Sequence, residues 1–144
     1  MINLKESLEQ IEILINEKEI NTSKIRELQI NFIKNELKNQ HCVDKFIGDF
    51  PTFIEPVHLQ SDVKIGDDVL IGPNVYIGEN CKIGNYSELI NTIIFDNVEI
   101  GENFKLENCI ISKNSKLTFN NLKAFSCILK GQTDTKEGLQ KFSF

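Results

Sequence analysis

An aliphatic residue recurs every six residues in the second half of the chain, and glycine usually follows it. The first blocks read LQSDVK, IGDDVL, IGPNVY, IGENCK and IGNYSE, beginning at Leu59. The residues that open these blocks are Leu59, Ile65, Ile71, Ile77 and Ile83, and the glycines are Gly66, Gly72, Gly78 and Gly84. A unit of six residues is too short to enclose a hydrophobic core of its own. The units must therefore stack on one another, as they do in a solenoid.

Each unit fits a short strand followed by a sharp corner. Alternating apolar residues, such as Val63 and Ile65, lie on the same face of a strand. The tetrads IGDD, IGPN, IGEN and IGNY place Gly, Asn and Asp where the chain must turn, because these residues tolerate left-handed backbone conformations. Three strands and three corners close a triangular coil of about eighteen residues. We expect parallel strands stacked from coil to coil around an aliphatic interior.

The repeat continues beyond these blocks with small slips. The interval between block openers is five residues at Leu89–Ile94 and again at Leu106–Ile111. From Leu117 the series becomes looser, and it extends through Leu122 to Ile128. Thirteen openers in the whole series predict a mainly β protein with a β-helix of about four coils.

The first forty residues contain neither Gly nor Pro and have a helical period. Asn3 can cap a first helix, with Glu6 as its reciprocal partner, and the break at residues 20–23 supplies a second cap. The apolar positions are Leu4, Leu8, Ile11 and Ile15, then Ile25, Leu28, Phe32, Ile33 and Leu37. We expect an α-helical hairpin that packs either on the β domain of its own chain or on a neighbouring subunit.

These patterns divide the chain into four segments. Residues 1–40 form the helical hairpin, 41–56 an irregular connector, 57–130 the β-helix and 131–144 a C-terminal tail or cap. Pro51 and Pro56 interrupt the connector. Its phenylalanines, which could cover an open end of the core, are Phe46, Phe50 and Phe53. The last segment loses the repeat, and we favour a cap formed by Leu139, Phe142 and Phe144 over docking on a partner.

Charge and composition exclude several classes of function. The net charge of −5 and the single arginine, Arg26, leave no general basic surface for nucleic acid. No stretch approaches the ~20 apolar residues that span a bilayer. The N-terminus lacks the apolar region of a secretory signal. We therefore expect a cytoplasmic protein that binds neither nucleic acid nor membranes.

A metal site is not expected. The four cysteines are Cys42, Cys81, Cys109 and Cys127. None of them occurs in a CxxC pair, and the chain has only two histidines, His41 and His58. We expect reduced thiols at core or half-buried positions. Cys81 replaces valine at a small inward position of the repeat, so it should be buried and unreactive.

The repeat over residues 57–128 resembles that of the hexapeptide transferase family. This resemblance implies a left-handed parallel β-helix and a homotrimer packed along one prism face. The stretch Asn91–Asn114, NTIIFDNVEIGENFKLENCIISKN, resembles the C-terminal β-helix of sugar-phosphate nucleotidyltransferases of the mannose-1-phosphate guanylyltransferase-like and glucose-1-phosphate thymidylyltransferase-like kinds. Those enzymes carry a nucleotide-binding domain with a glycine-rich phosphate loop ahead of the β-helix. Neither GxGxxG nor GxxxxGK occurs in this sequence, so the resemblance implies the fold and a sugar-nucleotide context without nucleotidyl transfer.

Two functions remain open. We favour a non-catalytic assembly or regulatory module, which could work with a separate sugar nucleotidyltransferase subunit and needs no cofactor. The alternative is a small acyltransferase with coenzyme A-linked donors and His58 as general base at an intersubunit cleft, as resemblance to acyltransferases of this fold implies. His58 should instead point outward into solvent, and His41 should add favourable charge at a helix C-terminus. The lysines that could hold coenzyme A phosphates are scattered: Lys64, Lys82, Lys105, Lys113 and Lys116.

The remaining polar residues of the repeat have structural interpretations. The carboxylates Asp67, Asp68, Glu79, Glu99 and Glu102 are expected at solvated corners. The asparagines Asn74, Asn80, Asn85 and Asn103 could stack as a ladder, but we favour the view that they allow tight turns. No catalytic or cofactor-binding residue is assigned from these patterns.

Overall fold

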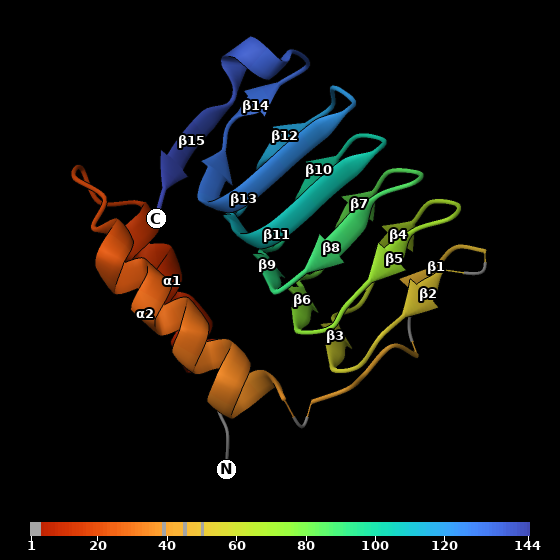
Figure 1. Cartoon of the computed structure of the whole chain (residues 1–144), viewed down its shortest axis with the longest axis horizontal. Coiled ribbons are helices and arrows are strands. Elements are labelled where there is room, and N and C mark those ends of the chain that lie inside the picture. The colour runs from red at the N-terminus through yellow and green to blue at the C-terminus, as the bar shows by residue number, and fades with distance from the viewer. Residues whose placement is uncertain (1–3, 39, 45, 50) are drawn as a thin grey trace.

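A parallel β-solenoid of about five turns forms the centre of the protein, and helices lie along one side of it (Figure 1). The computed structural model describes residues 4–38, 40–44, 46–49 and 51–144. The mainly β class and the parallel coils predicted from the six-residue repeat are confirmed. The left-handedness implied by the family resemblance stays a prediction.

The strands line three faces of the solenoid. The first face consists of β1 (Phe46–Ile47), β4 (Val63–Ile65), β7 (Lys82–Ile83), β10 (Glu99–Ile100), β12 (Lys116–Leu117) and β14 (Gln132–Thr133). The second face contains β2 (Thr52–Phe53), β5 (Leu70–Ile71) and β8 (Glu88–Ile90), and the third contains β3 (Val57–Leu59), β6 (Val75–Ile77) and β9 (Thr92–Ile94). The long strands β11 (Phe104–Ile111) and β13 (Leu122–Lys130) run through both the second and third faces. Strands from successive coils pair in parallel register on every face.

The block openers form the inner core, with one exception. On the first face Ile65, Ile83 and Ile100 pair in register and are buried, as the repeat predicts. Ile128 was expected to point inward as well, but it pairs with the outward-facing Ile110 and belongs to a second apolar cluster outside the solenoid. Its neighbours in β13, Cys127 and Leu129, take the inward positions in its place.

The solenoid begins earlier than the repeat indicates. Residues 41–56 were expected to be an irregular connector, yet β1 pairs with β4 and β2 pairs with β5. The rings of Phe46 and Phe53 meet edge-on at 5.3 Å and pack against the end of the inner core. This coil does contain an Ile-Gly pair, Ile47–Gly48, but the pair is out of phase with the later blocks, because Ile47 is exposed and Phe46 packs on the core. Counting this coil gives about five turns where about four were predicted. Phe50 lies outside the described residues.

Asparagine and aspartate, more than glycine, make the left-handed corners. Non-glycine residues with positive φ stack in three columns: Asp62, Asn80, Asn97 and Asn114; Asp68, Tyr86, Asn103 and Asn121; Asn74, Asn91, Asn108 and Ser126. Side chains within columns also hydrogen-bond, as from Asn74 Nδ2 to Asn91 Oδ1 at 2.8 Å and from Asn103 Nδ2 to Asn121 Oδ1 at 2.8 Å. These asparagines therefore both allow the tight turns and form hydrogen-bonded ladders, so the interpretation as turns alone is incomplete.

Glycine is needed for a different reason from the one proposed from the sequence. Of the glycines in the repeat, only Gly72 has a positive φ, of 110°. At Gly101 an added Cβ would lie 2.8 Å from the carbonyl carbon of Phe119 in the next coil. At Gly66 it would lie 2.8 Å from the backbone nitrogen of Asn85. Glycine thus allows adjacent coils to approach closely at the corners.

The N-terminal helices pack on the third face of the same chain. Helix α1 (Leu4–Ile15) is followed by α2 (Thr22–Asn31), which continues into the π-helical segment η1 (Phe32–Leu37). Asn21 caps α2 by accepting a hydrogen bond from the Lys24 backbone N–H at 3.1 Å. The antiparallel arrangement brings Ser7 within 2.5 Å of the Glu36 carboxylate. The predicted cap Asn3 lies outside the described residues.

A second apolar cluster joins the helices to the solenoid. Its members are Leu8, Ile11, Ile15, Ile25, Phe32 and Leu37 from the helices, and Tyr76, Ile93, Phe95, Ile110 and Ile128 from the solenoid. The buried Gln29 also donates from Nε2 to the backbone carbonyls of Asn91 (3.2 Å) and Cys109 (3.4 Å). Of the two docking alternatives for the hairpin, the structure shows the one within its own chain.

The C-terminal residues fold back on the last coil. After β14, η2 (Lys136–Gly138) leads into β15 (Gln140–Ser143), which pairs antiparallel with β13. Leu139 packs on the inner core, and Phe142 and Phe144 pack on the second cluster. The Arg26 guanidinium lies 5.6 Å from the centre of the Phe144 ring. Within the described residues, no helix has the length and apolar character needed to cross a membrane.

Candidate functional site

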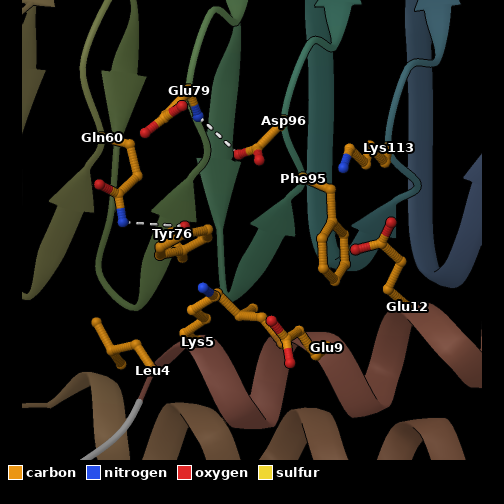
Figure 2. A pocket seen from close by; sticks show the side chains of 11 residues that line it. Leu4, Lys5, Glu9, Glu12, Gln60, Tyr76, Glu79, Phe95, Asp96 and Lys113 are labelled. Atoms are coloured by element: carbon orange, nitrogen blue, oxygen red, sulfur yellow. Dashed lines mark hydrogen bonds between the residues drawn. The ribbon is translucent and has the colours of Figure 1, made fainter.

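A cavity of about 380 Å³ lies between α1 and the third face (Figure 2). Helix α1 contributes Leu4, Lys5, Leu8, Glu9 and Glu12 to its lining. The solenoid contributes Gln60, Tyr76, Glu79, Phe95, Asp96 and Lys113. Its volume is within the range of about 300–1,000 Å³ that is usual for small-molecule sites. The cavity exists only because the hairpin docks on this face of the solenoid.

Aromatic rings form the floor of the cavity. Tyr76 and Phe95 are each only 5% exposed. The Tyr76 ring stacks on His58 with ring centres 5.7 Å apart, and it meets Phe32 edge-on at 5.9 Å. Gln60 Nε2 donates to the Tyr76 hydroxyl at 3.2 Å. Burial raises the pKa of Tyr76 to about 12, although the Gln60 hydrogen bond acts in the opposite direction. The hydroxyl therefore keeps its proton at neutral pH.

Charged side chains surround this floor. Four carboxylates, from Glu9, Glu12, Glu79 and Asp96, outnumber the ammonium groups of Lys5 and Lys113. Within the described part of the chain, none of these six groups is joined to another by an ion pair. Asp96 Oδ1 accepts a hydrogen bond from the Glu79 backbone N–H at 2.8 Å, as Figure 2 shows, which leaves its other oxygen available. The walls therefore offer both hydrogen-bond donors and acceptors, with an excess of negative charge.

Both histidines have structural contacts that sequence reasoning missed. His58 is half-buried and not fully solvated, because its ring stacks on Tyr76 and its Nδ1 lies 3.1 Å from the Gln40 carbonyl oxygen. His41 lies beyond the helix end at Leu37, and its Nδ1 accepts a hydrogen bond from the Val57 backbone N–H at 3.1 Å. The expected role of His41 at a helix C-terminus is therefore wrong.

The carboxylates of the repeat are spread over separate corners and one strand. Asp67 and Asp68 are both exposed, and the Asp67 backbone N–H donates to Asn85 Oδ1 at 2.8 Å. The Glu102 backbone N–H makes the same type of bond to Asn120, at 2.9 Å. Glu99 was expected at a corner, but it lies within β10, where it pairs in register with lysines of the adjacent strands.

The five lysines considered for coenzyme A do not converge. Lys64 and Lys82 are exposed on the first face, where Lys116 Nζ donates to the Asn97 carbonyl oxygen at 2.6 Å. Lys105 lies on the second face and pairs with Glu88 at 3.4 Å. Only Lys113 lines the cavity beside α1.

The cysteines are free thiols, and three of them are buried. Cys109 and Cys127 pair in register inside the solenoid, with their sulfur atoms 3.7 Å apart. Burial raises the pKa of Cys81 to about 12, so its thiol stays protonated at neutral pH. Among the described residues, no group of three or more His, Cys, Asp or Glu side chains is placed to hold a metal ion.

Replacing Cys81 with valine should reduce the loss of stability at alkaline pH. Below pH 9 the thiol is protonated in both the folded and the unfolded chain. The raised pKa of Cys81 means that between pH 9 and 12 only the unfolded chain loses this proton, so stability falls there. The free energy of unfolding decreases by at most about 1.4 kcal/mol per pH unit for one such group. Val63 and Val98 occupy the same inward position in the adjacent coils, so valine should fit.

Urea unfolding followed by circular dichroism at pH 7 and pH 10.5 measures this effect. We expect Cys81→Val to match the parent within about 1 kcal/mol at pH 7. At pH 10.5 it should be the more stable of the two proteins. If the free energy of unfolding fell by the same amount in both proteins between these pH values, ionisation of Cys81 would not contribute to the alkaline loss of stability.

The comparisons with known proteins support this architecture. Residues 53–139, more than half of the chain, match the family model of the GMPPB C-terminal domain, the β-helix of mannose-1-phosphate guanylyltransferase. The chain belongs to this family. No curated protein matches the chain. The match to the GMPPB C-terminal domain begins at Phe53, the last residue of β2, so it covers the solenoid after its first strands and leaves out the helices that complete the cavity. The resemblance to the guanylyltransferase β-helix inferred from the sequence is confirmed.

Sequence reasoning did not identify the residues that join the GMPPB-type solenoid to its helices. These are outward-facing positions of the third face, at Tyr76, Ile93, Ile110 and Ile128. The detectable signal is that adjacent residues are both apolar, as in Ile93–Ile94 and Ile110–Ile111. An exposed strand would alternate apolar and polar residues, so such pairs indicate a face that is covered on both sides.

Proposed function

We propose that this chain is a cytoplasmic, non-catalytic assembly or regulatory module that works with a separate sugar nucleotidyltransferase subunit. The observation that carries the proposal is the match of residues 53–139 to the β-helix of mannose-1-phosphate guanylyltransferase. The 144 residues contain neither GxGxxG nor GxxxxGK, and we place the glycine-rich phosphate loop of the proposed complex on the nucleotidyltransferase subunit. The module would act by binding that subunit.

The second face of the solenoid is the surface we propose for subunit contacts. The hairpin covers the third face, whereas the second face carries the exposed residues Ile54 (46%) and Phe125 (58%). Ile90 is half-buried and lies in the same register row as Phe125, with the exposed Glu107 between them. Apolar side chains gathered on one exposed face are typical of contact surfaces. We assign to this face the contacts of the homotrimer that the resemblance to hexapeptide transferases implies, and those of the nucleotidyltransferase complex.

Acyl transfer is less well supported than assembly. The Nδ1 atom of His58 faces the Gln40 carbonyl, and its ring is held against Tyr76. The lysines that would have to neutralise coenzyme A phosphates are distributed over different faces of the solenoid. A general base needs access to the substrate proton, and these contacts restrict the ring. The contacts of His58 favour a structural role for its ring, and the spread of the lysines disfavours binding of coenzyme A phosphates.

Native mass spectrometry of the tagged chain purified from its source tests the assembly role. We expect a defined complex that contains this chain and a nucleotidyltransferase subunit. Phe125→Asp should dissociate subunits, because it places a charge in the proposed contact surface. Tyr86→Asp is the matched control, since Tyr86 is an equally exposed aromatic residue (55%) at a corner. Purification of this chain without a nucleotidyltransferase would contradict the proposal.

Thermal melting with acetyl-CoA separates the two functions. A ligand that binds only the folded state stabilises it by RT ln(1 + [L]/Kd), which is about 2.7 kcal/mol at a hundredfold excess over Kd. We expect acetyl-CoA to leave the melting temperature unchanged. A saturable increase that is lost in His58→Ala would instead favour the acyltransferase function.

A further inference from the structure

We propose that the cavity between α1 and the third face binds an unphosphorylated monosaccharide. Its volume of about 380 Å³ lies near the lower end of the range for small-molecule sites, which suits one sugar ring better than a nucleotide. The site is distinct from the proposed contact surface on the second face. Sugar binding and complex formation can therefore succeed or fail independently of each other.

The polar groups of the cavity match the hydrogen bonding of a polyol. Each sugar hydroxyl can donate one hydrogen bond and accept others, so a sugar site needs both kinds of partner. The ammonium group of Lys113 and the remaining N–H of the Gln60 amide are donors. The Glu12 carboxylate and the second oxygen of Asp96 are acceptors. The Tyr76 hydroxyl, which accepts from Gln60, keeps its proton and can donate it to a ligand.

The floor of the cavity provides the apolar contact. The rings of Tyr76 and Phe95 are fixed by burial in the second apolar cluster, and Leu8 of α1 lies beside them. One side of a pyranose ring presents C–H groups, which can pack against such surfaces while the hydroxyls face the polar walls. The apolar floor lies against walls that are mostly polar and charged, an arrangement that suits a ligand with one apolar side and several hydroxyls.

The charge of the cavity argues against phosphorylated sugars. Four carboxylates and two ammonium groups give the lining a formal charge of −2. A phosphate would bring further negative charge into this field, without an arginine among the lining residues to accept it. A simple amine would be repelled by the ammonium groups of Lys5 and Lys113, which lie among the carboxylates. A neutral polyol is the class that uses both kinds of group without this repulsion.

Titration of the isotope-labelled full chain, followed by amide NMR shifts, tests the inference. The probes are D-glucose, D-galactose and D-mannose, their 1-phosphates, and putrescine as a simple amine. We expect saturable shifts at Glu79, Asp96 and Lys113 with at least one free hexose, and at least tenfold weaker binding of its 1-phosphate. The proposal is overturned if no free hexose gives saturable shifts there. It is equally overturned if the phosphate binds as tightly, or if only putrescine binds.

Two variants locate the site. Gln60→Leu should weaken hexose binding at least tenfold, whereas Gln132→Leu, on the exposed first face, should not. Because Gln60 also contacts Tyr76, Lys113→Met provides a second variant at an exposed position, with Lys123→Met as its control. Melting temperatures verify that all four proteins are folded. Equal hexose affinity in Gln60→Leu, Lys113→Met and the parent would place the ligand elsewhere and refute the proposal.

Discussion

Replacing Gly101 with valine is expected to lower the free energy of unfolding by at least about 3 kcal/mol, the upper part of the usual range for overpacking. The side chain would meet the backbone of the next coil, where an added Cβ already lies 2.8 Å from the Phe119 carbonyl carbon. Backbone cannot move aside as a flexible side chain can. The coils on either side would have to separate, and parallel strand pairing between β10 and β12 would weaken. Urea unfolding followed by circular dichroism measures the loss.

Lys82→Val is the matched control for this substitution. Lys82 is exposed on β7, in the neighbouring coil of the same face, where a β-branched residue suits the strand. We expect its unfolding free energy to stay within about 0.5 kcal/mol of the parent protein. If the Gly101 variant were as stable as this control, close approach of the coils would not be the reason for glycine in the repeat.

Replacing Ile93 with lysine is expected to release the helical hairpin from the solenoid. Ile93 is fully buried (0% exposed) between Tyr76 and Ile110 on the outside of the third face. An unpaired charge buried at this position would cost several kcal/mol. The inner core is left intact, because the inward residue of this strand is Ile94. Helices of 12 and 10 residues are marginal on their own, so the detached hairpin should lose helical structure.

Circular dichroism at 222 nm and limited proteolysis check this result. The helical signal should decrease and the hairpin should become sensitive to protease, while the solenoid resists digestion. Ile47→Lys is the control, since it makes the same substitution at a residue that is 59% exposed on the first face. The same helical signal and protease resistance in both variants would contradict the role assigned to Ile93.

The inner core was predictable from the sequence because one residue type recurs at one phase. Ile65 and Ile83 lie three repeats apart, and Ile100 follows 17 residues after Ile83 because one interval between them has five residues. An inward ladder explains this spacing. The same reasoning failed at Ile128, where the looser final blocks shift the phase by one residue. A shift of one residue turns a strand side chain to the opposite face.

The cavity could not be predicted because its walls come from different parts of the fold. Glu12 belongs to the hairpin, while Gln60 and Lys113 belong to corners of separate coils. The six-residue period describes inward positions and does not identify the partner of an outward one. The stacking of His58 on Tyr76 was missed for the same reason, since both residues face outward and their register follows only from the paired coils.

The covered third face also has a consequence for biosynthesis. The hairpin leaves the ribosome before the solenoid, yet it docks on Tyr76, Ile93, Ile110 and Ile128, which belong to successive turns of the solenoid. The helices are too short to persist alone, so their apolar stripes remain uncovered until translation has supplied the solenoid as far as Ile128. Lys130 donates to the Ile15 carbonyl at 3.4 Å, a contact between residues separated by 115 positions. Closure of this contact should be among the last steps of folding, and nascent chains should depend on chaperones until it forms.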